Sequence, residues 1–367
     1  MKKINLNEIL AYKTISPFKK NQTKFSDFDS LIKLSKKCKG KLFQDLKIYM
    51  VLVIKWHFDY LAKSGQNPKF LKKTINFWYK TFLIFLKFQK YNWIIEKRLK
   101  NKVIDVWKNT RKAFNFMWPL NTKKKYFGIS KILAELRIKQ VLNVASLNER
   151  VKVSSFLKDK YVLDSGCGPG RYINSLLKFN PKKIIGIDSG KSIIQSNRLR
   201  FSKYKNVKFI HSRIDKINLP SNSVDFVISA GVLHHLKASI SKSVREHCRV
   251  VKPKGYFFVF IVGSGGQELK LWNFCRKVMG EININYTFSL LNNKISPLRL
   301  QGLLDHSYGE YKSTDKLVFE KILKNNFSKV IPIKGILGAD VTKKTFFKDE
   351  YFLERFGSGN LRYLCVK

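Results

Sequence analysis

Residues 161–172 read Tyr-Val-Leu-Asp-Ser-Gly-Cys-Gly-Pro-Gly-Arg-Tyr, and this stretch decides the fold. A short apolar run leads into Gly166, Gly168 and Gly170, and a helical pattern follows. Glycine lets the backbone turn sharply and lets a ligand approach closely. The spacing Gly-x-Gly-x-Gly lacks the third glycine of Gly-x-Gly-x-x-Gly, because residue 171 is Arg. The stretch therefore predicts a strand–turn–helix ligand site and disfavours an NAD-dependent dehydrogenase.

Two acids accompany this loop. Asp164 stands at the end of the first strand, and Asp188 ends the next one in Ile-Ile-Gly-Ile-Asp. A carboxylate at the second position can accept hydrogen bonds from both hydroxyls of a ribose. Because NAD enzymes place an acid there too, Asp188 by itself predicts only a ribosyl ligand.

Strand-like and helical segments alternate around the glycine loop. We expect strands over 161–163, 183–187, 207–214, 224–229 and 256–262, with helices between them and another helix over 130–146. This alternation is typical of a parallel sheet wrapped by helices. We expect an irregular insert over 263–312, then a helix over 314–326 and strands over 329–333 and 361–366. Such an ending suits a sheet whose last pair is antiparallel, which predicts an α/β fold with a mostly parallel seven-stranded sheet.

Residues 1–125 are basic, aromatic and helical in pattern, with helices expected over 43–62 and 68–100. In the second helix Lys73, Lys80 and Lys87 recur every seven residues along one face, and apolar side chains line another. Three interpretations stay open: a helix packed on the rest of the chain with its lysines in water, a helix lying on an anionic membrane, or an RNA-binding face.

The net charge is +47, from 72 Lys and Arg against 25 Asp and Glu. Such a charge favours nucleic acid or anionic membranes as partners. Composition offers a simpler explanation, because lysine far outnumbers arginine and Asn, Ile and Phe are also abundant, all with A/T-rich codons. Base-reading and phosphate-clamping proteins tend to favour arginine.

The five cysteines are odd in number and form no Cys-x-x-Cys pair. This argues against a disulfide framework and against a zinc site, and no metal is expected. The first residues lack an apolar core of signal-peptide length, and the longest apolar runs are too short to span a bilayer. The sequence therefore predicts a cytoplasmic protein, with contact to a membrane surface as the alternative.

Four motifs resemble one family. The motifs VLDSGCGPGRY, IIGIDSGKSII, LPSNSVDFVISAGVLHHL (219–236) and VREHCRVVKPKGYFFVFI (244–261) occur in order. They resemble class I S-adenosylmethionine-dependent methyltransferases, and most closely the small-molecule enzymes of ubiquinone and menaquinone biosynthesis. The resemblance covers about 147–262. It implies a Rossmann-like methyltransferase domain over 126–367, preceded by the basic helical region 1–125, with 263–312 as a substrate cap.

The resemblance also implies roles for single residues around S-adenosylmethionine. The three glycines would pack on its methionine and ribose parts, Asp164 would lie near its amino group, and Asp188 would hold the ribose hydroxyls. Asp215 would lie near the adenine amine. The remaining residues expected to contact the cofactor are Cys167, Ser189, Ala230 and Gly231.

His234 and His235 follow the fourth strand, where donor and acceptor should meet. One of them can act as a general base if the acceptor has a proton to lose. The insert supplies the candidate substrate-binding side chains Trp272, Tyr286, His306 and Tyr308. For each of these four, packing is the competing interpretation.

Three functions follow for comparison. The first is methylation of a small-molecule or lipid-like acceptor. The second is RNA methylation, with the basic N-terminal region as an electrostatic dock. The third is a non-catalytic scaffold that binds the cofactor. The sequence specifies neither the acceptor nor the oligomeric state.

Overall fold

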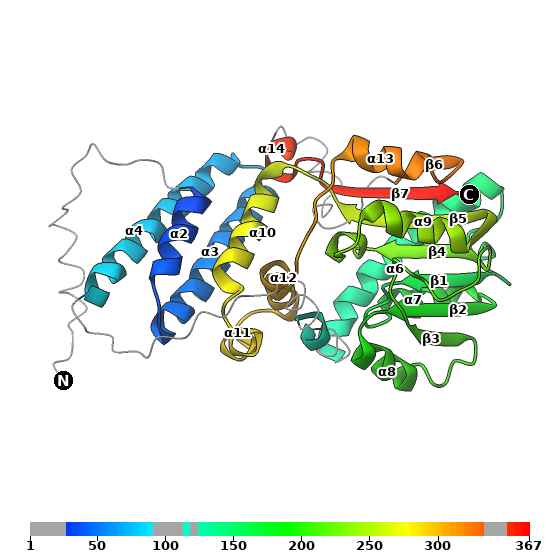
Figure 1. Ribbon diagram of the computed structural model, residues 1–367, viewed down its shortest axis with the longest axis horizontal. Coiled ribbons are helices and arrows are strands. Elements are labelled where there is room, and N and C mark those ends of the chain that lie inside the picture. Colours follow the sequence, from blue (N-terminus) through cyan, green and yellow to red (C-terminus); the bar gives the residue numbers. More distant parts are fainter. Residues whose placement is uncertain (1–26, 91–112, 118–123, 334–350) are drawn as a thin grey trace.

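The computed structural model describes residues 27–90, 113–117, 124–333 and 351–367. Its centre is a seven-stranded sheet in the order β3-β2-β1-β4-β5-β7-β6 (Figure 1). The strands are β1 Tyr161–Ser165, β2 Lys183–Asp188, β3 Val207–His211, β4 Val224–Ala230, β5 Val251–Val262, β6 Lys329–Pro332 and β7 Asn360–Val366. The first five run parallel, and β7 is antiparallel to both of its neighbours. The predicted Rossmann-like fold class is confirmed.

Helices cover both faces of the sheet. On one face α6 (Lys124–Glu149), α7 (Arg171–Leu176) and α8 (Lys191–Arg200) share a core with inward side chains such as Phe226, Ile228 and Phe258. On the other, α9 (Ile240–Val250) and α13 (Lys316–Lys324) pack on Leu163, Val227 and others. Because both faces are buried, the strands read as continuous apolar runs rather than as alternating ones.

Most strand positions agree with the sequence prediction, but several bounds differ. β3 ends at His211, earlier than expected, and β5 begins at Val251, earlier than the expected 256. The register shifts between Val224 and Phe226 opposite this part of β5, so the strand passes Pro253 and Lys254 through a bulge. A proline and a residue at positive φ hide such a strand from a pattern search.

The N-terminal part forms a helical unit beside the sheet. Its helices are α2 (Phe28–Lys37), α3 (Lys41–Ser64), the 3₁₀ turn η1 (Pro68–Phe70) and α4 (Leu71–Lys90). The expected helices over 43–62 and 68–100 correspond to α3 and to η1 with α4. Residues 91–100 lie outside the described residues.

The insert over 263–312 is helical, and the expectation of an irregular segment is wrong. It contains α10 (Gly266–Met279), α11 (Ile284–Leu291) and α12 (Pro297–Tyr308). Elsewhere in the described ranges lie η2 (Leu177–Phe179), η3 (Leu233–His235) and α14 (Phe352–Phe356), and residues 113–117 are helical as well. In α10 the buried residues follow helical spacing: Leu271, Phe274, Cys275, Val278 and Met279. The glycine-rich start of the insert, and the Ile-Asn-Ile-Asn run over 282–285 that leads into α11, hid this pattern.

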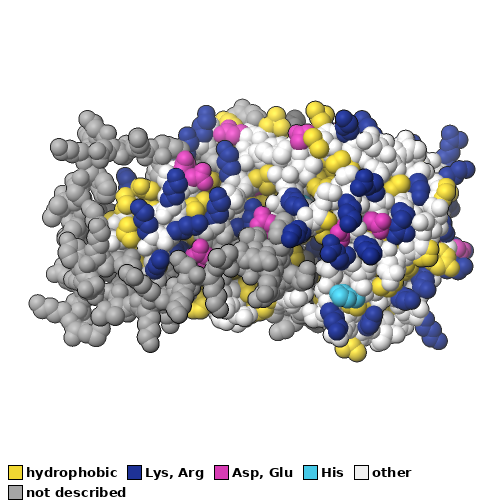
Figure 2. Space-filling model, in the orientation of Figure 1, with side chains coloured by type: hydrophobic (Ala, Val, Ile, Leu, Met, Phe, Trp, Pro, Cys, Tyr) yellow, Lys and Arg dark blue, Asp and Glu magenta, His cyan; other side chains and the backbone are white. Residues whose placement is uncertain are grey.

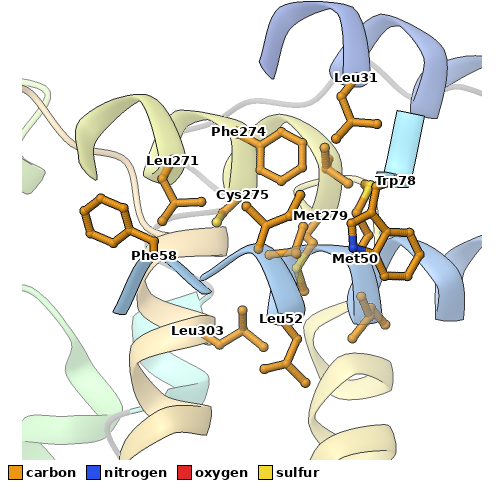
Figure 3. Close-up of a cluster of buried hydrophobic side chains, with 14 of the residues drawn as sticks. Leu31, Met50, Leu52, Phe58, Trp78, Leu271, Phe274, Cys275, Met279 and Leu303 are labelled. Atoms are coloured by element: carbon orange, nitrogen blue, oxygen red, sulfur yellow. The ribbon is translucent and has the colours of Figure 1, made fainter. Parts of the chain in front are cut away.

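One apolar core joins α10 and α12 to the N-terminal helices. Figure 3 shows Leu31, Met50, Leu52, Phe58 and Trp78 of α2–α4 against side chains of α10 and α12, namely Leu271, Phe274, Cys275, Met279 and Leu303. The insert thus packs on residues roughly 190 to 270 positions earlier in the chain. Since α10 directly follows β5, this helical unit lies at the carboxyl end of the parallel strands (Figure 1).

Within the described ranges, every helix is too short or too polar for a transmembrane span. Figure 2 shows Lys and Arg side chains over both the helical unit and the sheet part of the visible face, with few acids between them. The positive charge is therefore not confined to the N-terminal helices.

Candidate functional site

The glycine loop joins β1 to α7 at the carboxyl end of the central strands, where open α/β sheets bind ligands. The amides of Gly166 and Cys167 both donate to the carbonyl of Ile187, at 2.8 and 2.9 Å. Gly166 has φ +78°, and a Cβ there would lie 2.4 Å from Val232 Cγ1. Only glycine fits this close contact between the loop and the end of β4.

Gly170 has a different task from Gly166. A Cβ on Gly170 would lie 2.8 Å from the ring of Phe201, so this glycine admits the end of α8 beneath the loop. Gly166 and Gly168 line a cavity, whereas Gly170 lines neither cavity described below. The sequence prediction grouped all three glycines at the ligand.

Asp188 is held by the backbone around it. Its carboxylate accepts hydrogen bonds from the amide of Gly168 at 3.0 Å and from that of Gly190 at 2.8 Å. Burial raises its pKa, and the amide donors oppose that shift. The carboxylate thus has a fixed position at the end of β2, with lone pairs left for a ligand.

Asp164 lies behind the loop, with 1% of its surface exposed. Its Oδ2 has no hydrogen-bond partner in the described part of the chain. Burial raises its pKa to about 7, Arg171 opposes this, and Asp188 adds to it. A buried carboxyl oxygen without a donor is costly, and Asp164 lines neither of the two cavities described below.

Two cavities adjoin at the loop. The Asp188 cavity has a volume of about 490 Å³ and is lined by Asp188, Ser189 and Asp215, among others. The Trp272 cavity, about 320 Å³, is lined by Cys167, Ala230, His234 and Trp272, among others. Both cavities include Gly166, Gly231, Val232 and His235 in their walls. These shared residues mark the place where a ligand in one cavity meets a ligand in the other.

Asp215 lines the Asp188 cavity but is already paired. Arg213 donates to its two carboxylate oxygens, from Nε at 2.9 Å and from Nη2 at 2.6 Å. These hydrogen bonds lower the pKa of Asp215 and keep it ionised. A ligand amine near Asp215 would therefore share the carboxylate with Arg213.

His235 has a defined tautomer. Its Nδ1 lies 2.6 Å from the carbonyl oxygen of Glu310, and a carbonyl can only accept, so Nδ1 carries the proton. Burial lowers the pKa of His235, so the ring is neutral at physiological pH. Its Nε2 therefore carries a lone pair at the junction of the two cavities.

His234 is buried more deeply, with 3% of its surface exposed. Its ring stacks on Tyr311 with 5.3 Å between centroids and an interplanar angle of 11°. Burial holds its pKa well below the usual range, and its Nδ1 has no hydrogen-bond partner among the described residues.

Trp272 and His306 come together with these histidines. Their rings stack at 4.3 Å, and Trp272 also contacts Tyr311 at 5.1 Å. Tyr311, Glu268, Asp305, Arg137 and Arg171 line the same cavity, and the sequence prediction missed all five. Acidic residues are scarce in this chain, so the presence of Glu268 and Asp305 in the insert was the sequence signal that could have marked them as candidates.

Tyr286 and Tyr308 lie elsewhere. The hydroxyl of Tyr286 donates to Asp45 of α3 at 2.5 Å, and Tyr308 shares a hydrogen bond of 2.7 Å with Thr287. Both rings pack against the core of the helical unit, and neither lines the two cavities.

No group of three or more His, Cys, Asp or Glu that could hold a metal occurs within the described ranges.

The central part of the chain is similar to known proteins. Residues 163–259 match the family described as Methyltransferase domain. The chain is similar to the tRNA U34 carboxymethyltransferase of Helicobacter acinonychis, with 30% identity over 32% of this chain and 45% of that protein. It is also similar to the uncharacterized methyltransferase YcgJ of Bacillus subtilis, with 28% identity over 30% of this chain and 43% of that protein.

The crystal structure of YcgJ is similar as well. It shares 15% identity with a TM-score of 0.38, covering 62% of this chain and 97% of that one. The chain spans less than half the length of the curated relatives named above.

Proposed function

We propose that this chain, which carries a class I methyltransferase domain over residues 163–259, transfers the methyl group of S-adenosylmethionine to a small acceptor. The observation that carries this proposal is the pair of adjoining cavities that share His235. The Asp188 cavity contains an acid placed to bind a ribose, and the Trp272 cavity has a largely aromatic wall. A group transferred between their ligands would pass the shared residues.

The residues present fit the cofactor. Asp188 would hold the ribose hydroxyls, and Asp215 would lie on the adenine side. Asp164 lies behind the loop and lines neither cavity, and its carboxyl would act from there on the amino group of the methionine part. Gly166 and Gly231 would form the floor between the cavities. When bound, S-adenosylmethionine supplies a methyl group on a positively charged sulfur, which is already activated for displacement.

The protein's own contribution is alignment and proton removal. Ring packing around the Trp272 cavity keeps water away from the acceptor and fixes its orientation. The Nε2 atom of His235 can accept a proton from an acceptor that must lose one. We assign the base role to His235 and a packing role to His234, because only His235 lines both cavities.

We propose that the segment 263–312 acts as the substrate cap of the domain 126–367. α10 and α12 bring Glu268, Trp272, Asp305 and His306 over the carboxyl end of the sheet. The helices of the region 1–125 would hold this cap in place through their shared core. A cavity of about 320 Å³ roofed in this way suits a small molecule.

Calorimetric titration with S-adenosylmethionine, with NADH as the control ligand, tests the cofactor. Micromolar binding of S-adenosylmethionine and none of NADH is the expected result. Transfer of a tritiated methyl group into a pool of small metabolites would then separate an enzyme from a non-catalytic scaffold. If neither S-adenosylmethionine nor its demethylated product binds, the proposal is wrong.

RNA methylation is a second candidate, because curated relatives bear the name tRNA U34 carboxymethyltransferase and the net charge is +47. Phosphate contacts make affinity depend steeply on salt. RNA binding that weakens by orders of magnitude between 50 and 200 mM salt, with methyl transfer to RNA, would favour this candidate. Methyl transfer to small molecules alone would exclude it.

We further propose a cytoplasmic protein with peripheral contact to anionic membranes. All five cysteines are free, which supports a reducing compartment. On η1 and α4 the exposed side chains Phe70, Phe77 and Ile84 alternate with Lys73 and Lys80, a pattern suited to a lipid surface. Flotation with phosphatidylserine vesicles, and none with phosphatidylcholine vesicles, is the expected result. Absence of flotation at low salt would remove the membrane contact.

A further inference from the structure

Two carboxyl groups face the Trp272 cavity from the cap. Glu268 comes from α10 and Asp305 from α12, and both line the cavity. Neither forms an ion pair within 4.0 Å in the described part of the chain, and Oδ1 of Asp305 has no hydrogen-bond partner there. Burial raises the pKa of the Asp305 carboxyl, and the nearby Tyr311 hydroxyl opposes that shift. The chain has 72 basic and 25 acidic residues, so two carboxyls in one cavity without an ion pair are unexpected from the composition.

The rings next to these carboxyls are uncharged. Trp272 is 7% exposed and His234 is 3% exposed, and each has a ring nitrogen without a partner among the described residues. Burial holds the pKa values of His234 and His306 well below the usual range, so neither ring is positively charged. Aromatic faces next to carboxylates attract cations, and the orphaned ring nitrogens indicate that this wall meets a polar ligand.

The cationic groups of the cavity have another position. Arg171 directly follows the glycine loop, and Arg137 of α6 donates to the hydroxyl of Tyr172 at 3.1 Å. Both come from the sheet side, where the carboxylate of the cofactor's methionine part would lie. Arg276 sits over the Tyr311 ring at 5.1 Å and 4.0 Å from Glu310. Of the residues that line the cavity, the two arginines, Arg137 and Arg171, therefore stand on the side of the loop, and the two carboxyls stand on the cap.

We propose that the acceptor is an amine, held as its ammonium form by Asp305 and Glu268 against the rings of Trp272 and Tyr311. This inference rests on the proposed methyl transfer and specifies its substrate class. A carboxylic acid or phosphate ester would place its own negative charge beside the two carboxyls, which would repel it. Lys55 acts electrostatically on both carboxyls and Arg171 acts on Asp305, and an ammonium group would add a positive charge inside the cavity that a neutral acceptor does not supply.

The transfer step balances with the residues present. The ammonium gives a proton to Nε2 of His235, which leaves a neutral amine with a free lone pair. This lone pair forms the new N–C bond while the C–S bond breaks, and the electron pair of the C–S bond stays on sulfur. The products are the N-methylammonium ion and S-adenosylhomocysteine, and the positive charge passes from sulfur to nitrogen. Asp305 and Glu268 hold a positive charge before and after the step.

Binding of amine probes to the full chain, saturated with S-adenosylhomocysteine, tests this proposal by calorimetry. The probes are phenethylamine and tryptamine, and the matched isosteres are 2-phenylethanol and 3-phenylpropionate. The amines should bind at least 10-fold more tightly than either isostere. Asp305→Asn and Glu268→Gln should each weaken amine binding by about 10- to 100-fold. Both variants should leave the affinity for S-adenosylhomocysteine within about threefold.

Glu354→Gln, at an exposed carboxylate on α14, is the control and should change neither affinity. If Asp305→Asn loses its circular dichroism spectrum, Glu268→Gln is the decisive variant, since the Glu268 side chain makes no hydrogen bond within the described ranges of the chain. Equal or tighter binding of an isostere overturns the proposal, as does unchanged amine binding in Glu268→Gln. Protein that binds S-adenosylhomocysteine but no amine also overturns it. Protein that does not bind S-adenosylhomocysteine refutes the methyl transfer itself.

Discussion

Replacing Asp188 tests the cofactor site most directly. Its carboxylate is fixed by the amides of Gly168 and Gly190, so its remaining lone pairs would be preorganised for the two ribose hydroxyls of the proposed cofactor. A hydrogen bond to a charged group contributes about 1.5–3 kcal/mol. Two such bonds that are not fully additive should cost about 3 kcal/mol when lost, or about 100-fold in Kd. Asp188→Ala should therefore bind S-adenosylmethionine about 100-fold more weakly.

The affinity of Asp188→Asn for S-adenosylmethionine should lie between those of Asp188→Ala and the wild type. The Asn side chain keeps one acceptor oxygen but turns an NH₂ group toward a backbone amide. Calorimetry at pH 8 is the assay, with Asp29→Ala, at an exposed acid on α2, as the control. The raised pKa of Asp188 sets a second expectation. The wild-type affinity should decline as the pH falls toward that pKa, whereas Asp188→Ala should change little. A folded Asp188→Ala protein that binds within threefold of the wild type would refute the reasoning.

Three further predictions concern single positions. His235→Gln should lower kcat by about 10²- to 10⁴-fold with unchanged cofactor affinity, measured by methyl transfer and calorimetry; a loss of affinity instead would assign His235 to binding. Burial lowers the pKa of His247 to about 4 while its Nε2 accepts from Ser165 at 2.7 Å, and the unfolded chain binds the proton near pH 6.5. The free energy of unfolding should thus fall as pH drops from 6.5 toward 4, by about 3 kcal/mol, and urea titrations of His247→Asn should show a flatter pH profile. Gly166→Ala should weaken cofactor binding more than 10-fold, because its Cβ would overlap Val232 at a positive φ; wild-type affinity by calorimetry would contradict this contact.

The local parts of the site could be predicted from the sequence, because their signals are local. Asp188 and the glycine loop lie within 30 residues of each other, and the order of apolar runs fixes which strand ends they occupy. The position of His235 follows from the end of β4 in the same way. Its tautomer does not, because it depends on the carbonyl of Glu310, 75 residues later.

The acceptor side could not be predicted in the same way. Trp272, Tyr286, His306 and Tyr308 are similar aromatic candidates in sequence, and only the packing of α10–α12 separates them. Trp272 and His306 line the cavity, whereas the Tyr286 hydroxyl binds Asp45 of α3. Which face of each helix meets the cavity depends on the core that these helices share with the N-terminal region.

That shared core also determines how late in synthesis the N-terminal helices can finish folding. α2, α3 and α4 leave the ribosome first, but much of their apolar surface is covered by α10 and α12, which are made after the sheet strands β1–β5. At about 5–20 residues per second, the wait between the end of α4 and the start of α10 lasts roughly 10–35 s. During this time the nascent chain presents an exposed apolar surface beside many lysines. Chaperone binding to ribosome-bound chains should therefore begin with α3 and α4 and end once α12 has emerged.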